Sequence, residues 1–466
     1  MALSRIWSAF VIIAVLVASI RIVASDNKVI FSSMVTGKSG DTIHLRQTDT
    51  TTFSDVQLHQ LDSLGYMAMG NASVKRTGNG KLEYYQVQNA DGIIETCKSA
   101  VNISIGLIGI MALFMGFMSI AERAGGIRLL SKIIGPFFSK LFPELPKGHP
   151  AMGHMMMNFS ANLLGLDNAA TPFGLKAMQS LQEINPSAER ASNAQIMFLC
   201  LHAAGFSLIP VSVIAVRAAL RSANPTDIFV PCMITTFVAT MAAMFIVSYK
   251  QKINLFQPVI IAWVGGFSAL IVLLVIYLNR LSVDGIQTFS SILSNGLILL
   301  IFLLIILGAL YKKIDVFDAF IDGAKGGFET AVKIIPYLVG MLVAISLLRT
   351  SGSFDMVIDG MKTFFAYMGM DTRFVDALPT ALIRPLSGGG ARGMMVSTMT
   401  TFGADSFPGR LSSIMQGASD TTFYVIAVYF GAVNIKDTRY AVGAMLLADL
   451  VGVITAILLA YMFFGR

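Results

Sequence analysis

Three short runs of polar residues interrupt apolar stretches of this chain. The first run, "NFSANLLGLDNAATP" (158–172), sets amides and a hydroxyl around one carboxylate: Asn158, Asn162, Asp167, Asn168 and Thr171. The second, "RPLSGGGARG" (384–393), contains Ser387, Gly388 and Gly389, and the third, "QGASDTT" (416–422), contains Gln416, Ser419, Asp420, Thr421 and Thr422. Amides and hydroxyls can donate or accept hydrogen bonds, and glycine lets the backbone come close to a solute. These residue types predict a binding site for a small polar solute.

The composition indicates that these runs lie in a membrane protein. Hydrophobic residues make up 55% of the 466 positions and charged residues only 13%, whereas soluble domains carry about 25% charged residues. A membrane-spanning helix needs roughly 20 mostly apolar residues. The candidate spans are Ala100–Ala121, Ala194–Val216, Ile228–Tyr249, Leu255–Leu278, Phe289–Tyr311 and Ala441–Phe464. We therefore predict an all-α, polytopic membrane helix bundle.

Acidic residues within such a bundle are candidates for ion coupling. A charge at mid-membrane costs about 2.5–3.5 kcal/mol on insertion scales, and such residues usually mark a site or an ion path. We assign this role to Asp420, Asp405 and Asp449, and we expect Arg384 and Arg410 to be internal ion-pair partners. Packing is the alternative for any single polar residue, since such residues bond neighbouring membrane helices at about 0.6 kcal/mol each. For Asp420, a helix cap is a second alternative.

Signatures of enzymes and metal sites are missing from the sequence. The three cysteines form no disulfide framework, and the histidines have no close metal-ligand spacing, so we interpret His149, His154 and His202 as structural. No Walker loop, zinc-protease motif or Gly-x-Ser-x-Gly elbow occurs. We expect no enzymatic activity, no cofactor, no metal and no nucleic-acid partner.

Two related halves are indicated by an internal repeat. The segments that begin at Glu95 and Glu329 each contain an apolar span, a break at Ala124-Gly125-Gly126 or Ser351-Gly352-Ser353, and an amphipathic segment. The run from Gly165 also resembles the run from Gly403. Paired halves of transporters contribute discontinuous helices whose ends meet near the bilayer midplane, where irregular backbone is tolerated only if it is buried or lines a cavity. We therefore expect broken or re-entrant helices in each half.

The chain divides into five parts on this interpretation. They are a first membrane helix and lead-in (1–35), a polar extramembrane insertion (36–90), a first half (91–253), central linking helices (254–315) and a second half (316–466). The insertion ends in "KLEYYQVQ", a candidate strand. Clusters of Lys and Arg flank several spans and place those loops in the cytoplasm, which puts the insertion outside. We favour retention of the first helix over its cleavage as a signal peptide.

The motifs around these polar runs resemble those of a known family. "NLLGLDNAATPFGLKAM" is similar to the signature of spore maturation protein A, and "RPLSGGGARG" with "GADSFPGRLSSIMQGASDTTFYVIAVYFGAVNIKDTRYAV" is similar to that of spore maturation protein B. The chain thus resembles a fusion of the two, covering nearly everything outside Thr36–Gln88. The resemblance implies two copies of the nucleoside-recognition, or gate, domain, which also occurs in concentrative nucleoside transporters and ferrous-iron transport proteins. It further implies a glutamate at the position of Asp420.

Together these observations lead to two expectations about function. The first is a secondary transporter for a small polar solute, with nucleosides as one candidate class, driven by H⁺ or Na⁺ and with its site between the halves. The second is a non-transporting membrane protein that acts in envelope or spore maturation through partners. In both cases we expect a multi-pass protein in the lipid bilayer of the bacterial cytoplasmic (inner) membrane. The solute, the coupling ion and the oligomeric state stay open.

Overall fold

The computed structural model describes most of the chain, with gaps mainly in the insertion. The described residues are 2–25, 29–37, 44–48, 53, 57–58, 61, 66–69, 72–76, 82–86, 92–146, 148–163, 167–281 and 283–465. Helices dominate, and within the described residues seven of them are long and apolar enough to cross a membrane. These seven are α1 (Ala2–Ser25), α4 (Ile93–Arg123), α10 (Phe229–Gln251), α11 (Pro258–Asn279), α12 (Val283–Tyr311), α13 (Val316–Thr350) and α19 (Ala441–Phe464). The prediction of an all-α membrane bundle is confirmed.

The same order of helices occurs in both halves. The first half continues from α4 through α5 (Gly126–Leu141), α6 (Pro150–Leu163), α7 (Asp167–Glu183), α8 (Asn193–Ala204) and α9 (Val211–Ala219) to α10. The second continues from α13 through α14 (Ser353–Tyr367), η2 (Val375–Ala377), α15 (Leu378–Ile383), α16 (Gly388–Phe402), α17 (Phe407–Gly417), α18 (Thr422–Val425) and the π-helical turn η3 (Ile426–Phe430) to α19. In each half, the break after the first long helix contains a glycine with left-handed backbone, Gly125 at φ 81° and Gly352 at φ 78°.

This order corrects one detail of the repeat. The run from Gly165 leads into α7, which corresponds by position to α16, whereas the run from Gly403 leads into α17, the counterpart of α8. The N-caps agree, because Ser192 caps α8 and Ser406 caps α17, each accepting a hydrogen bond from the backbone three residues on. The misleading similarity has a local cause, since proline and small polar residues recur wherever a helix begins.

The predicted span Ala194–Val216 is not one helix. α8 ends at Ala204, Gly205 adopts a left-handed conformation (φ 43°), and α9 begins only after Pro210. Glycine tolerates this backbone, and proline cannot continue the hydrogen bonding of a helix. The two short helices therefore form a broken pair, and the linker between them faces the cavity described below.

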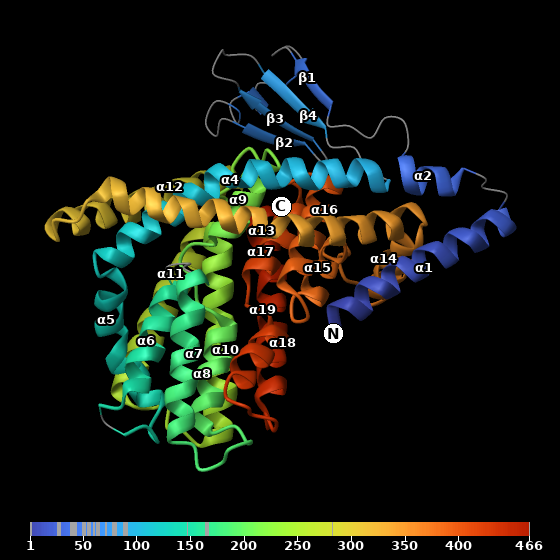
Figure 1. Ribbon diagram of the computed structural model, residues 1–466. Coiled ribbons are helices and arrows are strands. Elements are labelled where there is room, and N and C mark those ends of the chain that lie inside the picture. Colours follow the sequence, from blue (N-terminus) through green and yellow to red (C-terminus); the bar gives the residue numbers. More distant parts are fainter. Residues whose placement is uncertain are drawn as a thin grey trace.

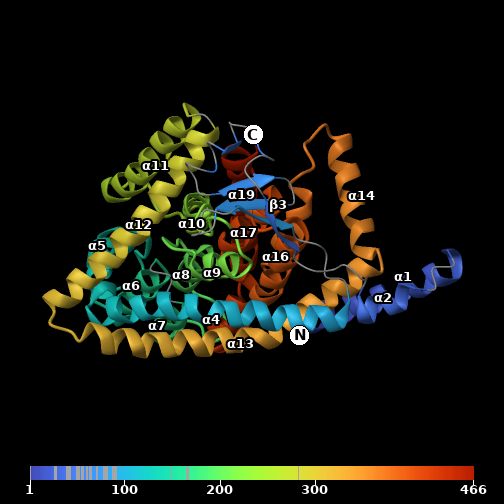
Figure 2. The same ribbon diagram turned by 90° about the horizontal axis from the view of Figure 1, so that it is seen from above.

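The long helices α4 and α13 run side by side and antiparallel across the molecule (Figures 1 and 2). Their approach depends on glycines of α13. A Cβ at Gly327 would lie 2.6 Å from the carbonyl oxygen of Met111. A Cβ at Gly323 would collide with the carbonyl oxygen of Met115 and the Cβ of Ser119. Small residues four apart allow membrane helices to pack backbone to backbone. This pair forms a shared framework that joins the two halves.

The central helices α11 and α12 lie at the periphery, as Figure 2 shows for the view from above. Only 6% of the apolar window of α11 and 17% of that of α12 is buried. Helices that are apolar on all faces, and that other helices do not cover, are expected to contact lipid. These two helices connect the halves, and none of their described side chains lines the cavity.

The polar insertion contains a small antiparallel sheet in the order β1-β4-β3-β2. Its strands are β1 (His44–Thr48), β2 (Tyr66–Met69), β3 (Ala72–Arg76) and β4 (Leu82–Gln86), and they follow the short helix α2 (Ile30–Thr36). β4 confirms the strand expected in "KLEYYQVQ". Leu61, Met67, Val74 and Leu82 form a separate apolar cluster, and Figure 1 shows the sheet outside the helical bundle, above α4.

Candidate functional site

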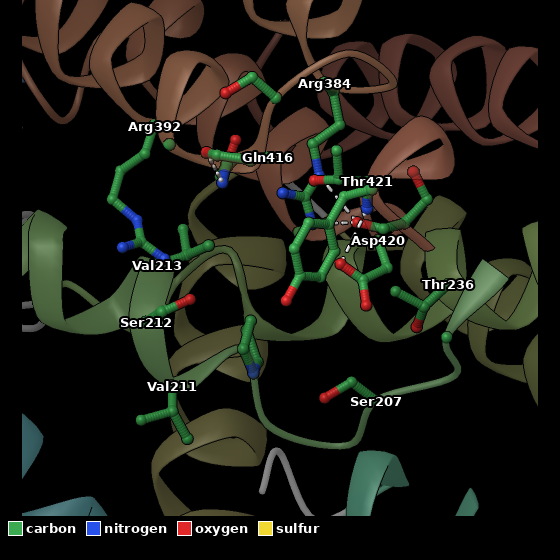
Figure 3. A pocket seen from close by; sticks show the side chains of 18 of the residues that line it. Ser207, Val211, Ser212, Val213, Thr236, Arg384, Arg392, Gln416, Asp420 and Thr421 are labelled. Atoms are coloured by element: carbon green, nitrogen blue, oxygen red, sulfur yellow. Dashed lines mark hydrogen bonds between the residues drawn. The ribbon is translucent and has the colours of Figure 1, made fainter. Parts of the chain in front are cut away.

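A cavity of about 770 Å³ lies between the two halves (Figure 3). Ligand-binding pockets typically measure about 300–1,000 Å³, so this volume suits a small molecule. The first half lines it with residues of α6, α8, α9, α10 and the α8–α9 linker. The second half contributes α13, the α15–α16 corner, and α17 to η3. The polar and charged lining residues are Asn162, His202, Ser207, Ser212, Thr236, Thr330, Arg384, Ser387, Arg392, Gln416, Ser419, Asp420, Thr421 and Tyr424.

The linkers of two broken helices meet in this cavity. One joins α8 to α9 and contains Gly205 and Ser207, and the other joins α17 to α18 and contains Ser419 and Asp420. The α17–α18 linker touches the end of α8, because the backbone N–H of Asp420 donates to the carbonyl of Ala203 at 2.6 Å. Residues of all three predicted polar runs line the cavity, although more than 200 residues separate the first run from the other two in sequence.

The start of α16 closes one side of the cavity. Ser387 caps this helix, since its Oγ accepts from the N–H of Gly390 at 3.0 Å. Gly388 and Gly389 also line the cavity. A Cβ at Gly388 would lie 2.7 Å from Oγ1 of Thr421. The glycine run therefore allows the helix start to approach the α17–α18 linker.

Among the described lining residues, two arginines and one carboxylate supply the charge. In Figure 3, Arg392 and Gln416 lie toward one side, while Arg384, Thr421 and Asp420 lie together toward the other. The guanidinium of Arg384 donates to the carbonyl of Ser419 through Nε at 2.8 Å and also through Nη2. Arg384 thus fixes the linker that carries Asp420.

Gln416 has a buried acceptor directed at this space. Its side chain lines the cavity and is 4% exposed, and within the described structure its Oε1 has no hydrogen-bond partner. Its Nε2 makes only a long contact of 3.5 Å with the carbonyl of Gly388. Leaving a buried acceptor unsatisfied costs about 1–3 kcal/mol, so a donor on a bound solute would be favourable here.

His202 is a residue of the site that sequence reasoning missed. It lies in the last turn of α8, is 3% exposed, and its Nε2 is 3.9 Å from Oδ2 of Asp420. Its Nδ1 is 2.8 Å from Nδ2 of Asn162 and 3.0 Å from Oδ1 of Asn158. No spacing marked this histidine, because its partners come from other elements. The only usable signal was its position three residues before the helix-ending Gly205.

The remaining residues of the first polar run lie deeper or outside the lining. Asn158 is buried behind His202 and donates through Nδ2 to the carbonyl of Ala170 at 2.6 Å. Thr171 lies on α7 away from the lining. Asp167 and Asn168 begin α7, and their side chains lie outside the described part of the structure.

Asp449 lies behind the α17–α18 linker. Thr422 donates to its Oδ2 at 2.6 Å, and both side chains are buried. Neither residue is part of the cavity lining. This pair joins α18 to α19 beneath Asp420.

Asp405 and Arg410 lie in a separate buried network rather than at the cavity. Asp405 pairs with Arg217 at 3.1 Å, Arg217 pairs with Asp227 at 2.8 Å, and Arg410 pairs with Asp227 at 2.7 Å. Arg410 also donates to the backbone carbonyl of Asp405. The network connects the α9–α10 turn of the first half to the α16–α17 corner of the second. Among the described residues, no group of three or more His, Cys, Asp or Glu side chains is placed to hold a metal ion.

Comparison with known proteins agrees with the two-half architecture. The family model Gate, described as "Nucleoside recognition", matches residues 104–220 and 331–436. The first match ends after α9 and the second after η3, so the two stop at corresponding places. No solved structure matches this chain.

Two curated relatives each cover about a third of the chain. Spore maturation protein B of Bacillus subtilis (strain 168) is 47% identical over 173 residues, which are 37% of this chain and 96% of that protein. Spore maturation protein A of the same organism is 41% identical over 159 residues, which are 34% of this chain and 81% of that protein. Both identities lie well above the level at which homology is in question. This chain belongs to the spore maturation protein A and B family, and it joins regions similar to both proteins in a single polypeptide that matches the Gate model in two regions.

Proposed function

We propose that this protein is a secondary transporter of the bacterial cytoplasmic membrane that moves a small polar, nucleoside-like solute. An H⁺ or Na⁺ gradient drives it, and it carries out no reaction on the solute. The observation that carries the proposal is the cavity between the halves, where two broken helices meet and Gln416 presents an unsatisfied acceptor. Discontinuous helices at the interface of structural repeats are the usual site of secondary transporters. The family name "Nucleoside recognition" supports the solute class.

Gln416→Leu in liposomes tests this proposal. We expect reconstituted wild-type protein to take up radiolabelled uridine or adenosine. The variant should raise the KM at least about tenfold, the value of one lost hydrogen bond of 1.4 kcal/mol. Because Oε1 has no protein partner, the thermal midpoint of the variant should not fall. Gln195→Leu is the contrasting variant, since Gln195 is fully buried but bonded to Ser192 and Gln182, and its loss should lower the midpoint.

The alternative is a non-transporting role in envelope or spore maturation. The printed names of the two relatives favour it, because both are called spore maturation proteins. It makes the opposite prediction for the same assay. Neither nucleoside would be bound, taken up or exchanged by the wild-type protein, and Gln416→Leu would differ from it in nothing but stability.

A further inference from the structure

Three side chains lie in a row from α6 to the α17–α18 linker: Asn158, His202 and Asp420. The orientation of the Asn158 amide is fixed, because its Nδ2 lies 2.6 Å from the carbonyl oxygen of Ala170. A carbonyl oxygen only accepts, so the amide nitrogen must face it. The oxygen Oδ1 of Asn158 is therefore the atom that faces Nδ1 of His202, at 3.0 Å.

The same ring nitrogen has a second neighbour with the opposite demand. Nδ2 of Asn162 lies 2.8 Å from Nδ1 of His202. A ring nitrogen that carries a proton donates, and one that carries a lone pair accepts. Asn158 is thus satisfied only when Nδ1 is protonated, and Asn162 in this orientation only when it is not. The two asparagines make Nδ1 a position with two alternative hydrogen-bonded states.

The other ring nitrogen faces a carboxylate in both states. Nε2 of His202 lies 3.9 Å from Oδ2 of Asp420, whose side chain is 46% exposed while that of His202 is 3% exposed. A proton on Nε2 keeps this contact favourable when the ring is neutral. When Nδ1 also gains a proton, the resulting imidazolium is stabilised by the carboxylate. His202 also lies in the last turn of α8, where the helix dipole favours a cation.

The other groups around the ring leave this assignment in place. The ring of Tyr429 packs edge-on against that of His202, with 4.8 Å between ring centroids. Phe198 stacks on His202 at 6.0 Å and also contacts Tyr429. The Arg384 guanidinium is bonded to the carbonyl of Ser419, and Asp449 is bonded to Thr422. Among the described residues, Asp420 is therefore the acid that forms an ion pair with the ring, at 3.9 Å.

We propose that His202 binds the coupling proton, as an imidazolium held between Asp420 and Asn158, and that this protein is driven by protons and not by sodium. The coupling role rests on the proposed transport function. The proton reaches Nδ1 from the cavity on the side of Asn162, which lines it together with His202. Its binding converts Nδ1 from an acceptor for Asn162 into a donor to Asn158. The step forms one N–H bond at Nδ1 and breaks one O–H bond of hydronium, which leaves as water.

Asn162 connects the proton to the solute. It is the asparagine of the pair that lines the cavity. With a proton on Nδ1, its amide nitrogen is released from the ring and becomes available to a solute acceptor. With a lone pair on Nδ1, the amide nitrogen is held by the ring and the cavity loses this donor. Proton binding and solute binding therefore favour each other, as linkage requires.

Nitrogen NMR of ¹⁵N-histidine-labelled protein in lipid bilayers tests the proton site without any solute. The chain has five histidines, and His202→Gln identifies the signal of interest by its loss. We expect both ring nitrogens of His202 to be protonated at low pH and only Nε2 at high pH. Asp420→Asn should move this transition down by about one pH unit or more, because an opposite charge at this range is worth 1–3 units. A ring that shows no transition between pH 4 and 9, or one indifferent to Asp420→Asn, would overturn the assignment.

Uptake of labelled uridine by liposomes tests the coupling. An inward proton gradient should drive accumulation in wild type, and any exchange that remains in His202→Gln should be independent of pH. His154→Gln is the matched control, since His154 lies on α6 outside the cavity lining, beside Ser180. Accumulation driven by sodium alone, or undiminished proton-driven accumulation in His202→Gln, would contradict the proposal. If wild type neither binds nor exchanges uridine or adenosine, the proposed function fails, and the NMR transition still decides the proton site.

Discussion

The guanidinium of Arg217 in the first half donates to the carboxylate of Asp405 in the second half at 3.1 Å, and both side chains are at least 97% buried. Asp227 and Arg410 complete the network, which contains two positive and two negative side chains. Arg217 is fully buried and Ser222, Asn224 and Ala404 supply further acceptors for it. The network is thus a polar joint between the halves, within a largely apolar core.

Asp405→Asn should destabilise the protein by about 3–5 kcal/mol. Removing one partner of a buried pair leaves the other charge uncompensated, which is the costly case. The thermal unfolding midpoint in detergent, followed by intrinsic fluorescence, measures the loss. Glu189→Gln is the control, because Glu189 and Lys436 also join the two halves but are 61% and 73% exposed, so the change should stay within about 1 kcal/mol. Equal losses in the two variants would show that burial of the Asp405 network has no special cost.

The neighbouring glycines Gly326 and Gly327 should respond differently to alanine. A Cβ at Gly327 would lie 2.6–2.7 Å from the backbone of Met111 and Ala112, whereas one at Gly326 would lie 3.9 Å from the end of the Met115 side chain. Gly327→Ala therefore has to push α13 away from α4, and Gly326→Ala only gains helix propensity, about 0.8–1 kcal/mol. Unfolding midpoints should fall for Gly327→Ala and hold or rise for Gly326→Ala. A tolerated Gly327→Ala would mean that the two helices do not pack through this face.

The insertion should be removable without loss of the bundle. Gly37 follows α2 and Gly92 precedes α4, and the two lie against each other, since a Cβ at Gly92 would collide with the backbone of Gly37. Deleting residues 38–91 with a two-glycine linker keeps α2 and α4 in place. We expect a membrane-inserted protein with unchanged size-exclusion behaviour and unchanged uridine uptake. Normal expression with abolished uptake would instead assign the sheet a part in gating or solute binding.

The sequence predicted the elements that depend on local composition. Apolar length identified α4, α10, α11, α12 and α19, and the glycine breaks at Gly125 and Gly352 were located from small residues alone. These features depend on neighbours along the chain, so they can be read without knowing the fold. The broken helix pair α8–α9 was missed because "GFSLIP" is itself apolar and hides its turn within a hydropathy average.

The chemistry of the site was predictable only in part. Polar side chains in apolar surroundings indicated Asn162, Ser387, Gln416 and Asp420, all of which line the cavity. The same criterion could not separate Asp405, because a buried ion-pair network and a solute site both place acids among apolar residues. Asp405 faces Arg217, whereas Asp420 faces the cavity. This difference depends on how the two halves pack, which the sequence does not reveal.

Asp420→Glu should strengthen the proposed proton site, because the longer side chain brings the carboxylate closer to the ring of His202. The carboxylate now stops 3.9 Å from Nε2 of His202, beyond hydrogen-bond distance, and its Oδ1 accepts from the N–H of Thr421 at 2.8 Å. One more carbon–carbon bond adds about 1.5 Å of reach, enough for a direct bond to the ring. The imidazolium would then be more stable, so half-maximal uridine uptake should occur at a higher pH than in wild type. Asp359→Glu, on the exposed face of α14, is the matched control and should leave the profile unchanged.

The resemblance implies glutamate at the position of Asp420. Retained coupling in Asp420→Glu with loss in Asp420→Asn would therefore show that the charge is required. Loss in both variants would show instead that the short side chain is needed for another purpose, such as holding the linker through Thr421.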